Sequence, residues 1–315
     1  KPDPTDEASD AESSTASITS SILNYRQLHG RTFHGERGTA NYWAANDAKQ
    51  NDLLDIVHAF NTLHLDGGLY AAPIKDINPK VKVLDIGTGT GIWAIDFAEE
   101  FPDCQVIGTD VSPIQPSWVP PNVKFEIEDA TQPWTYPANS FDYVHIRWLI
   151  GSVPSWEALF AEAFRVLKPG GYLETWEPAD RIYADDGSVK PDDALGQWAV
   201  LFREGGKKIG RSFNLYDGDV QGQSMRSAGF EEVGRRDFTT PVGQWPRDPK
   251  LKEIGMFAQA AFEVDTEGYI LFLATTIGWK MEEVKAYVQQ AIRELRSRTR
   301  RPQYRQRVVW GRKPE

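Results

Sequence analysis

The chain has 315 residues, a formal net charge of −10 and a single cysteine. Its length suits two average domains, or one α/β domain enlarged by insertions. The acidic balance argues against general nucleic-acid binding, because phosphates repel negative surfaces. Since Cys104 is the single cysteine of the sequence, an internal disulfide is excluded.

The two ends of the sequence differ strongly in charge. Residues 1–20 combine five acids with eight Ser and Thr, which predicts a disordered acidic tail. Residues 293–313 hold nine basic residues and a single acid, Glu294. This basic segment suits contact with RNA, an acidic partner or an import receptor, or it is a solvated helix face that runs into a strand. The longest apolar stretch, near residues 268–279, is too short to span a bilayer and predicts a core helix.

The first predicted element is a helix over residues 41–65, where apolar residues recur at helical spacing. Asn46 or Asp47 suits an internal helix start, and the pair Gly67-Gly68 ends the pattern. Strands are then predicted over 81–86, 104–109, 123–128, 141–146 and 172–176, and helices over 92–101 and 156–167. This strand–helix alternation predicts a parallel sheet with helices on both faces. The carboxyl ends of its strands meet at one edge, where ligands of such sheets bind.

The remaining elements follow the fifth predicted strand. Helices are predicted over 192–209, 217–228, 251–262, 268–279 and 282–298, and strands over 230–240 and 303–311.

A glycine-rich turn and three carboxylates fall at the predicted ligand edge. The turn Asp85-Ile86-Gly87-Thr88-Gly89-Thr90-Gly91 follows the first strand, where glycines let a ligand approach the backbone. Its spacing is neither G-x-G-x-x-G nor a phosphate-binding P-loop. Asp110 ends the second strand and suits the hydroxyls of a ribose, while Asp129 ends the third and suits a purine amino group. The three acids suit a ligand with ammonium, ribose and adenine groups, such as S-adenosylmethionine; a dinucleotide oxidoreductase is the competing possibility.

At these motifs the sequence resembles the class I S-adenosylmethionine-dependent methyltransferases. VLDIGTGTG, the acid at 110, EDA at 128–130, FDYV at 141–144 and RVLKPGGY at 165–172 are similar to successive motifs of that family. The resemblance implies a Rossmann-like seven-stranded sheet whose last strand is antiparallel. It implies that the cofactor contacts Asp85, Gly87, Thr88, Gly89, Gly91, Asp110, Val111, Asp129 and Ala130. The glycine turn and Asp85 would hold the methionine part, Asp110 the ribose, and Asp129 with Ala130 the adenine.

A narrower resemblance to the fungal LaeA-like methyltransferases extends outside that core. GRTFH at 30–34, SPIQP at 112–116, HIR at 145–147 and WGRKP at 310–314 carry it. It implies a link to secondary metabolism and a cytoplasmic or nuclear location. The founding members are regulators that associate with velvet-type proteins, so it also implies a possible velvet-type partner.

The fold implied by the resemblance predicts three additions to one methyltransferase domain over residues 76–315. We expect a helical cap over residues 21–75, a cover over 178–215, and a helical insert over 241–302 between the last two strands. These three pieces would cover the cofactor site, and together they are called the roof. The methyl acceptor would then be recognised by residues of the roof. Candidate wall residues of the roof are Tyr42, Trp43, Trp118, Trp176 and Trp245.

Three residues at the end of the fourth strand are candidates for catalysis. His145 is the residue type best suited to remove a proton from the acceptor, although a packed structural histidine fits the same position. Arg147 lies at the strand end, and Trp148 suits the wall of a methyl pocket. The sequence has no metal-ligand cluster and no nucleophile elbow, so we predict neither a metal nor a covalent intermediate. The predicted function is methyl transfer to an unidentified small molecule or protein, with a LaeA-like regulatory protein as the alternative.

Overall fold

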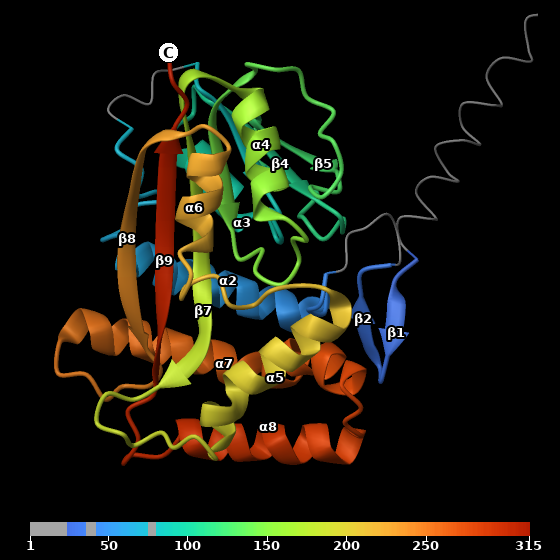
Figure 1. Ribbon diagram of the computed structural model, residues 1–315, viewed down its shortest axis with the longest axis vertical. Helices are drawn as coiled ribbons and strands as arrows, with labels where there is room; N and C mark the ends of the chain where they lie inside the picture. Colours follow the sequence, from blue (N-terminus) through green and yellow to red (C-terminus); the bar gives the residue numbers. More distant parts are fainter. Residues whose placement is uncertain (1–23, 36–41, 75–79) are drawn as a thin grey trace, which may run out of the picture.

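The fold is described from a computed structural model that covers residues 24–35, 42–74 and 80–315. The predicted acidic tail over residues 1–20 lies outside these residues. A seven-stranded sheet in the order β5-β4-β3-β6-β7-β9-β8 forms the centre (Figure 1). Its strands are β3 (Lys82–Ile86), β4 (Gln105–Asp110), β5 (Val123–Ile127), β6 (Phe141–Arg147), β7 (Leu167–Tyr183), β8 (Glu231–Pro241) and β9 (Gln303–Arg312).

The sheet is parallel from β5 to β7, and β9 runs antiparallel to both of its neighbours, β7 and β8. The predicted Rossmann-like sheet with an antiparallel last strand is therefore confirmed. The strand β7 is longer than predicted and continues to Tyr183, so the predicted cover over 178–215 begins inside the sheet. Residues of β7 keep pairing with β9 beyond residue 176, up to Tyr183 with Gln303, which explains the extension.

Side chains of β3 alternate between the two faces of the sheet, and each face buries its own core. Val83 packs in the core that contains Trp93 and Phe97 of α3 (Ile92–Glu100). Leu84 packs in the core that contains Phe160 of α4 (Trp156–Val166) and Met225 of α6 (Val220–Ser227). Helices on both faces bury the central strands, as is usual for parallel sheets, while the edge strands β5 and β8 keep exposed residues.

The first predicted helix begins later than predicted. The helix α2 covers Ala48–His64, and the Asp47 side chain accepts a hydrogen bond from the Gln50 amide at 3.2 Å as its N-cap. Residues before the cap are extended because they pair with the hairpin of β1 (Arg26–Leu28) and β2 (Arg31–Phe33): the Asn46 amide donates to the Thr32 carbonyl at 2.9 Å. Thus Asp47, and not Asn46, caps the helix.

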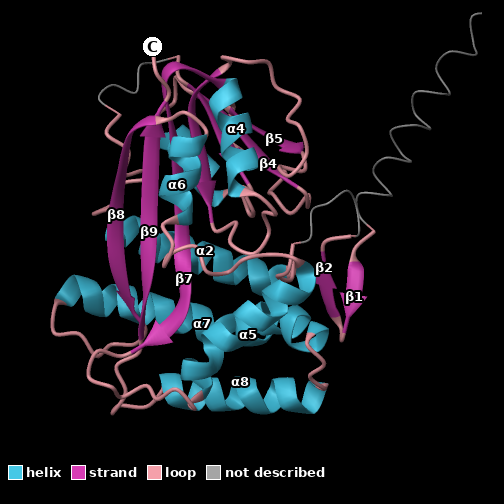
Figure 2. Ribbon diagram, in the orientation of Figure 1, coloured by secondary structure: helices cyan, strands magenta, loops and turns pink. Residues whose placement is uncertain are grey.

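Four helices gather at the carboxyl end of the parallel strands (Figure 2). They are α2, α5 (Ala194–Ile209), α7 (Pro249–Thr276) and α8 (Met281–Leu295). The helix α7 joins two predicted helices across a kink at Asp265, which has φ −148° and ψ 49°. The buried Asp265 carboxylate accepts from the Gly268 amide and from the Arg31 guanidinium, and Arg31 also binds the cap residue Asp47. This pairing ties α2, α7 and the hairpin together. Within the described residues, no helix is both long and apolar enough to cross a membrane.

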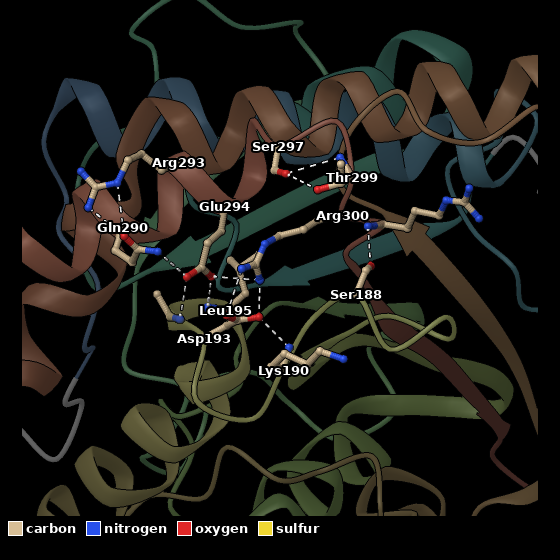
Figure 3. A network of polar contacts seen from close by, with 12 residues as sticks. Ser188, Lys190, Asp193, Leu195, Gln290, Arg293, Glu294, Ser297, Thr299 and Arg300 are labelled. Carbon is tan, nitrogen blue, oxygen red and sulfur yellow. Dashed lines mark hydrogen bonds and ion pairs between the residues drawn. The ribbon is translucent and has the colours of Figure 1, made fainter.

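The basic segment near the carboxyl end makes contacts inside the fold (Figure 3). The Arg300 guanidinium pairs with the Asp193 carboxylate at the start of α5. Glu294 of α8 accepts hydrogen bonds from the amides of Ala194 and Leu195, at 3.1 and 2.9 Å. These amides are the orphan donors of a helix start, so α8 caps α5. Carboxylates also pair with Arg296, Arg301, Arg307 and Arg312. Much of the positive charge therefore holds the fold together.

Candidate functional site

A cleft of about 1130 Å³, including the part open to solvent, lies at the carboxyl edge of the sheet. Its lining comes from α2, the turn after β3, the ends of β4, β5 and β6, and the residues that follow β6. The lining includes Asp85, Gly87, Thr88, Gly89, Asp110, Val111, Asp129, Ala130, His145, Arg147 and Trp148. The structure therefore brings eleven of the twelve predicted site residues to one cleft; Gly91 does not line it.

The glycine turn gives the cleft a bare backbone surface. Gly87 has φ +68°, and a Cβ added there would lie 2.5 Å from the Leu149 Cδ2 atom. Gly91 has φ +83°, caps the start of α3, and an added Cβ would collide with the ring of Phe125. A left-handed backbone without space for Cβ requires glycine at both positions. Gly91 thus fixes the conformation of the turn without lining the cleft.

The three predicted acids are fixed by hydrogen bonds. Asp85 accepts from the Thr88 hydroxyl at 2.6 Å, and its other oxygen contacts His145 Nδ1 at 2.7 Å. Asp110 accepts from the amides of Gly89 and Ser112, both at 2.9 Å. Asp129 accepts from the amide and hydroxyl of Thr131, at 2.9 and 2.6 Å. The acids hold the loops around the cleft, and carboxylate oxygens still have lone pairs for a ligand.

Burial raises the pKa of Asp110 to about 6, because desolvation outweighs the three backbone hydrogen bonds to its carboxylate. The nearby Asp85 adds to the rise by charge repulsion. Hydroxyl donors from a ligand would favour the ionised form and lower this pKa. A ligand that donates to Asp110 is therefore bound more weakly in acid.

His145 and Arg147 lie on the face of β6 that points toward α3 and α2. The His145 ring stacks on Trp93 at 3.7 Å with 7° between the planes, and burial lowers its pKa. The Arg147 guanidinium donates to His58 Nδ1 at 3.0 Å, and His58 Nε2 contacts Asp96 at 2.8 Å. Within the described residues, no ion pair joins Arg147 to a carboxylate, and burial lowers its pKa to about 10. Arg147 is thus a desolvated cation that faces the cleft.

Trp148 has a strained backbone at the rim of the cleft. Its φ is +60°, which is rare for a bulky residue and is maintained by the surrounding structure. The Trp148 amide donates to the Trp176 carbonyl at 3.0 Å, and the next two amides donate to the Glu177 carboxyl, each at 2.9 Å. Glu177 is 1% exposed, and burial raises its pKa to about 8. The sequence analysis missed Glu177. An acidic residue beside the apolar residues of a strand could have indicated a buried carboxyl group with a specific role.

The comparisons with known proteins decide the family. A model described as "Methyltransferase domain" matches residues 64–233. Methyltransferase pytC of Aspergillus terreus is 36% identical over 288 residues, which cover 90% of this chain and 86% of the relative. Secondary metabolism regulator LAE1 of Cochliobolus heterostrophus is 32% identical, over 87% of this chain and 90% of the relative. The chain belongs to the S-adenosylmethionine-dependent methyltransferases.

This methyltransferase is also a member of the LaeA-like branch, as its motifs predicted. Among solved structures, a phosphoethanolamine N-methyltransferase of Haemonchus contortus has a TM-score of 0.49 and 17% identity. That similarity covers 96% of this chain and 74% of the other chain.

The residues of the cleft fit S-adenosylmethionine, which supplies an electrophilic methyl carbon on a positively charged sulfur when it is bound. The carboxylates of Asp85, Asp110 and Asp129 suit hydroxyl, amino and ammonium groups. The cation of Arg147 suits the one carboxylate of that cofactor. Asn46 Oδ1 also lines the cleft and is buried without a partner within the described residues, which leaves an acceptor for a ligand donor.

Two of the five aromatic residues predicted to line the site do line a cavity. Tyr42 lines the cofactor cleft, and Trp43 lines a second cavity beside it. The other three predictions are wrong. Trp118 is 84% exposed, Trp176 is buried against Phe238, and Trp245 donates to the Pro302 carbonyl. Sequence reasoning missed Leu54 and Val57 of α2, which line the cleft and lie on the apolar face of that helix. Within the described residues, no cluster of His, Cys, Asp and Glu can hold a metal.

Proposed function

We propose that this methyltransferase acts as an enzyme on a small-molecule acceptor of fungal secondary metabolism. One observation carries the proposal: Val57 and Trp148 of the cofactor cleft also line a second cavity inside the fold. The wall of that cavity is mostly apolar and aromatic, as is common for small-molecule sites. The fungal relatives pytC and tdiE, both named methyltransferases, support the same assignment.

We propose the following roles for the cleft residues. The backbone of the glycine turn over residues 87–91 and Asp85 hold the methionine part of the cofactor, with Thr88 fixing Asp85. Asp110 and the adjacent Val111 hold the ribose, and Asp129 with Ala130 holds the adenine.

Arg147 binds the methionine carboxylate in this proposal, because it is a half-buried cation without a carboxylate partner within the described residues. His145 is a positioning residue for Asp85, because its contacts to Asp85 and Trp93 account for its burial. Trp148 lines both the cofactor cleft and the cavity of the acceptor.

A second candidate function is regulation through a protein partner, favoured by the relatives that are named secondary metabolism regulators. In that case the chain would act in the nucleus with a velvet-type protein, and the bound cofactor would mainly stabilise the complex.

A labelling experiment separates the two functions. The enzyme is incubated with methyl-tritiated S-adenosylmethionine and an extract of a fungal culture that produces secondary metabolites. Label in the organic-solvent fraction supports the small-molecule proposal, and label confined to precipitated protein contradicts it. In cells, both Gly87 and Gly89 are replaced by leucine, which should add bulk to the turn that lines the cleft. A cellular role that survives this change would favour the regulatory function.

A further inference from the structure

We propose that the second cavity binds an uncharged, flat aromatic or conjugated molecule, and that this ligand is the methyl acceptor. The proposal rests on the proposed function and names its substrate class. The cavity lies beneath the roof, between the end of β6, the far part of β7, and the helices α5 and α7.

Aromatic rings form most of the wall of this cavity. Trp43 stacks on Tyr269 at 6.0 Å and meets Phe213 edge-on at 5.3 Å. Trp198 of α5 meets Phe262 of α7 edge-on, also at 5.3 Å. The rings come from segments far apart in the sequence. Flat aromatic ligands are held by such stacked and edge-on contacts.

The charged groups of the wall favour an uncharged ligand. Asp180 is 7% exposed, and its carboxylate is neutralised by the Arg203 guanidinium at 2.6 Å. The Trp43 indole already donates to the Ile150 carbonyl at 2.7 Å. The Trp148 indole nitrogen is buried and has no partner within the described residues. An unpaired donor of this kind accommodates one oxygen or nitrogen acceptor of an otherwise apolar ligand.

The backbone at the boundary of the two cavities also points to a site. The strained backbone of Trp148 places its ring at the boundary with the cofactor cleft. Strain of this kind persists where it serves a site.

In this proposal the acceptor meets the methyl group at the boundary of the two cavities, which Trp148 and Val57 line. A lone pair on a hydroxyl oxygen or amino nitrogen of the acceptor forms the bond to the methyl carbon. The electron pair of the breaking carbon–sulfur bond stays on sulfur, and the proton of the acceptor passes to water in the open cofactor cleft.

The test uses N-phenyl-1-naphthylamine, an uncharged flat aromatic probe whose fluorescence rises in apolar sites. We expect saturable binding of one probe per chain, without displacement by saturating S-adenosylhomocysteine. Ala261→Leu adds bulk to the cavity from α7, and Ala258→Leu, one turn earlier, is the second variant. At least one folded variant should bind the probe tenfold or more weakly, with S-adenosylhomocysteine affinity within twofold of wild type by calorimetry. Trp118→Ala removes an exposed aromatic side chain and should change neither affinity.

Three results would overturn the proposal: no saturable probe binding, displacement of the probe by S-adenosylhomocysteine, or unchanged probe affinity in every folded leucine variant. Loss of probe binding in Trp118→Ala would also contradict it, because the probe would then bind at the surface. Failure of wild type to bind S-adenosylhomocysteine would instead refute the cofactor roles, so the two failures are distinguishable.

Discussion

The role of Asp110 predicts that cofactor affinity depends on pH. Its pKa of about 6 in the free protein means that the carboxyl is ionised at pH 7.5 and mostly protonated at pH 5. The ionised form accepts hydrogen bonds from ribose hydroxyls, whereas protonation removes acceptor capacity. If binding needs the ionised form, the Kd for S-adenosylhomocysteine is about tenfold higher at pH 5 than at pH 7.5, or about 1.4 kcal/mol.

The variant Asp110→Asn separates this effect from other titrations. Asparagine keeps the shape but has one acceptor oxygen, so either the Gly89 or the Ser112 amide loses its partner. We expect affinity at pH 7.5 to fall roughly 10- to 100-fold, since hydrogen bonds to charged groups contribute about 1.5–3 kcal/mol. The variant should lose the pH dependence below 7, apart from any part due to His58 and His145, whose pKa values are lowered by burial.

Isothermal titration calorimetry with S-adenosylhomocysteine at pH 5, 6 and 7.5 measures both effects. Glu157→Gln, which removes one exposed charge on α4, is the control and should match wild type. A pH-independent Kd in wild type, or the same pH profile in Asp110→Asn, would refute the reasoning.

Three further predictions concern the turn, the cation and the strained loop. Gly87→Ala should lose about 1–2 kcal/mol of stability from its left-handed backbone, and cofactor affinity as well. Gly187→Ala, at a similar φ of +69° but with open space around it, should lose stability alone, as measured by thermal unfolding and calorimetry. Arg147→Met should weaken S-adenosylhomocysteine binding at least tenfold, with partial rescue in Arg147→Lys; equal affinities would contradict a carboxylate contact. Because the pKa of Glu177 is raised to about 8, the folded state retains a proton that the unfolded state releases, and stability should fall from pH 6 to pH 8.5. The limit is about 1.4 kcal/mol for each pH unit, and urea unfolding of Glu177→Gln should show a smaller fall.

The cofactor half of the site could be predicted because short segments encode it. The turn over residues 85–91 carries its own glycines, and Asp110 and Asp129 follow their strands directly. Period-two alternation and the right-handed crossover rule then bring the strand ends to one edge. The contacts of these acids are also local: Asp129 binds Thr131 and Asp110 binds Ser112.

The rim of the cleft could not be predicted in the same way. Residues 176 and 177 are neighbours in β7 and point to opposite faces of the sheet. The prediction chose the aromatic Trp176, which packs against Phe238, and missed Glu177, whose carboxyl fixes the amides of Leu149 and Ile150. Strand periodicity separates the two residues, but it does not show that Glu177 reaches the segment after β6, which only the hydrogen bonds of the folded chain reveal.

The two halves of the site therefore have different determinants. The contacts predicted for the cofactor lie within residues 85–130. In contrast, Trp43, Trp198 and Tyr269 of the second cavity come from three distant parts of the chain. Substitutions in the roof can change the second cavity without touching the glycine turn or the strand-end acids. The exception is the segment after β6, because Trp148 lines both cavities and Glu177 fixes the residues that follow it. Acceptor specificity should therefore vary most freely in α5 and α7, and least at Trp148.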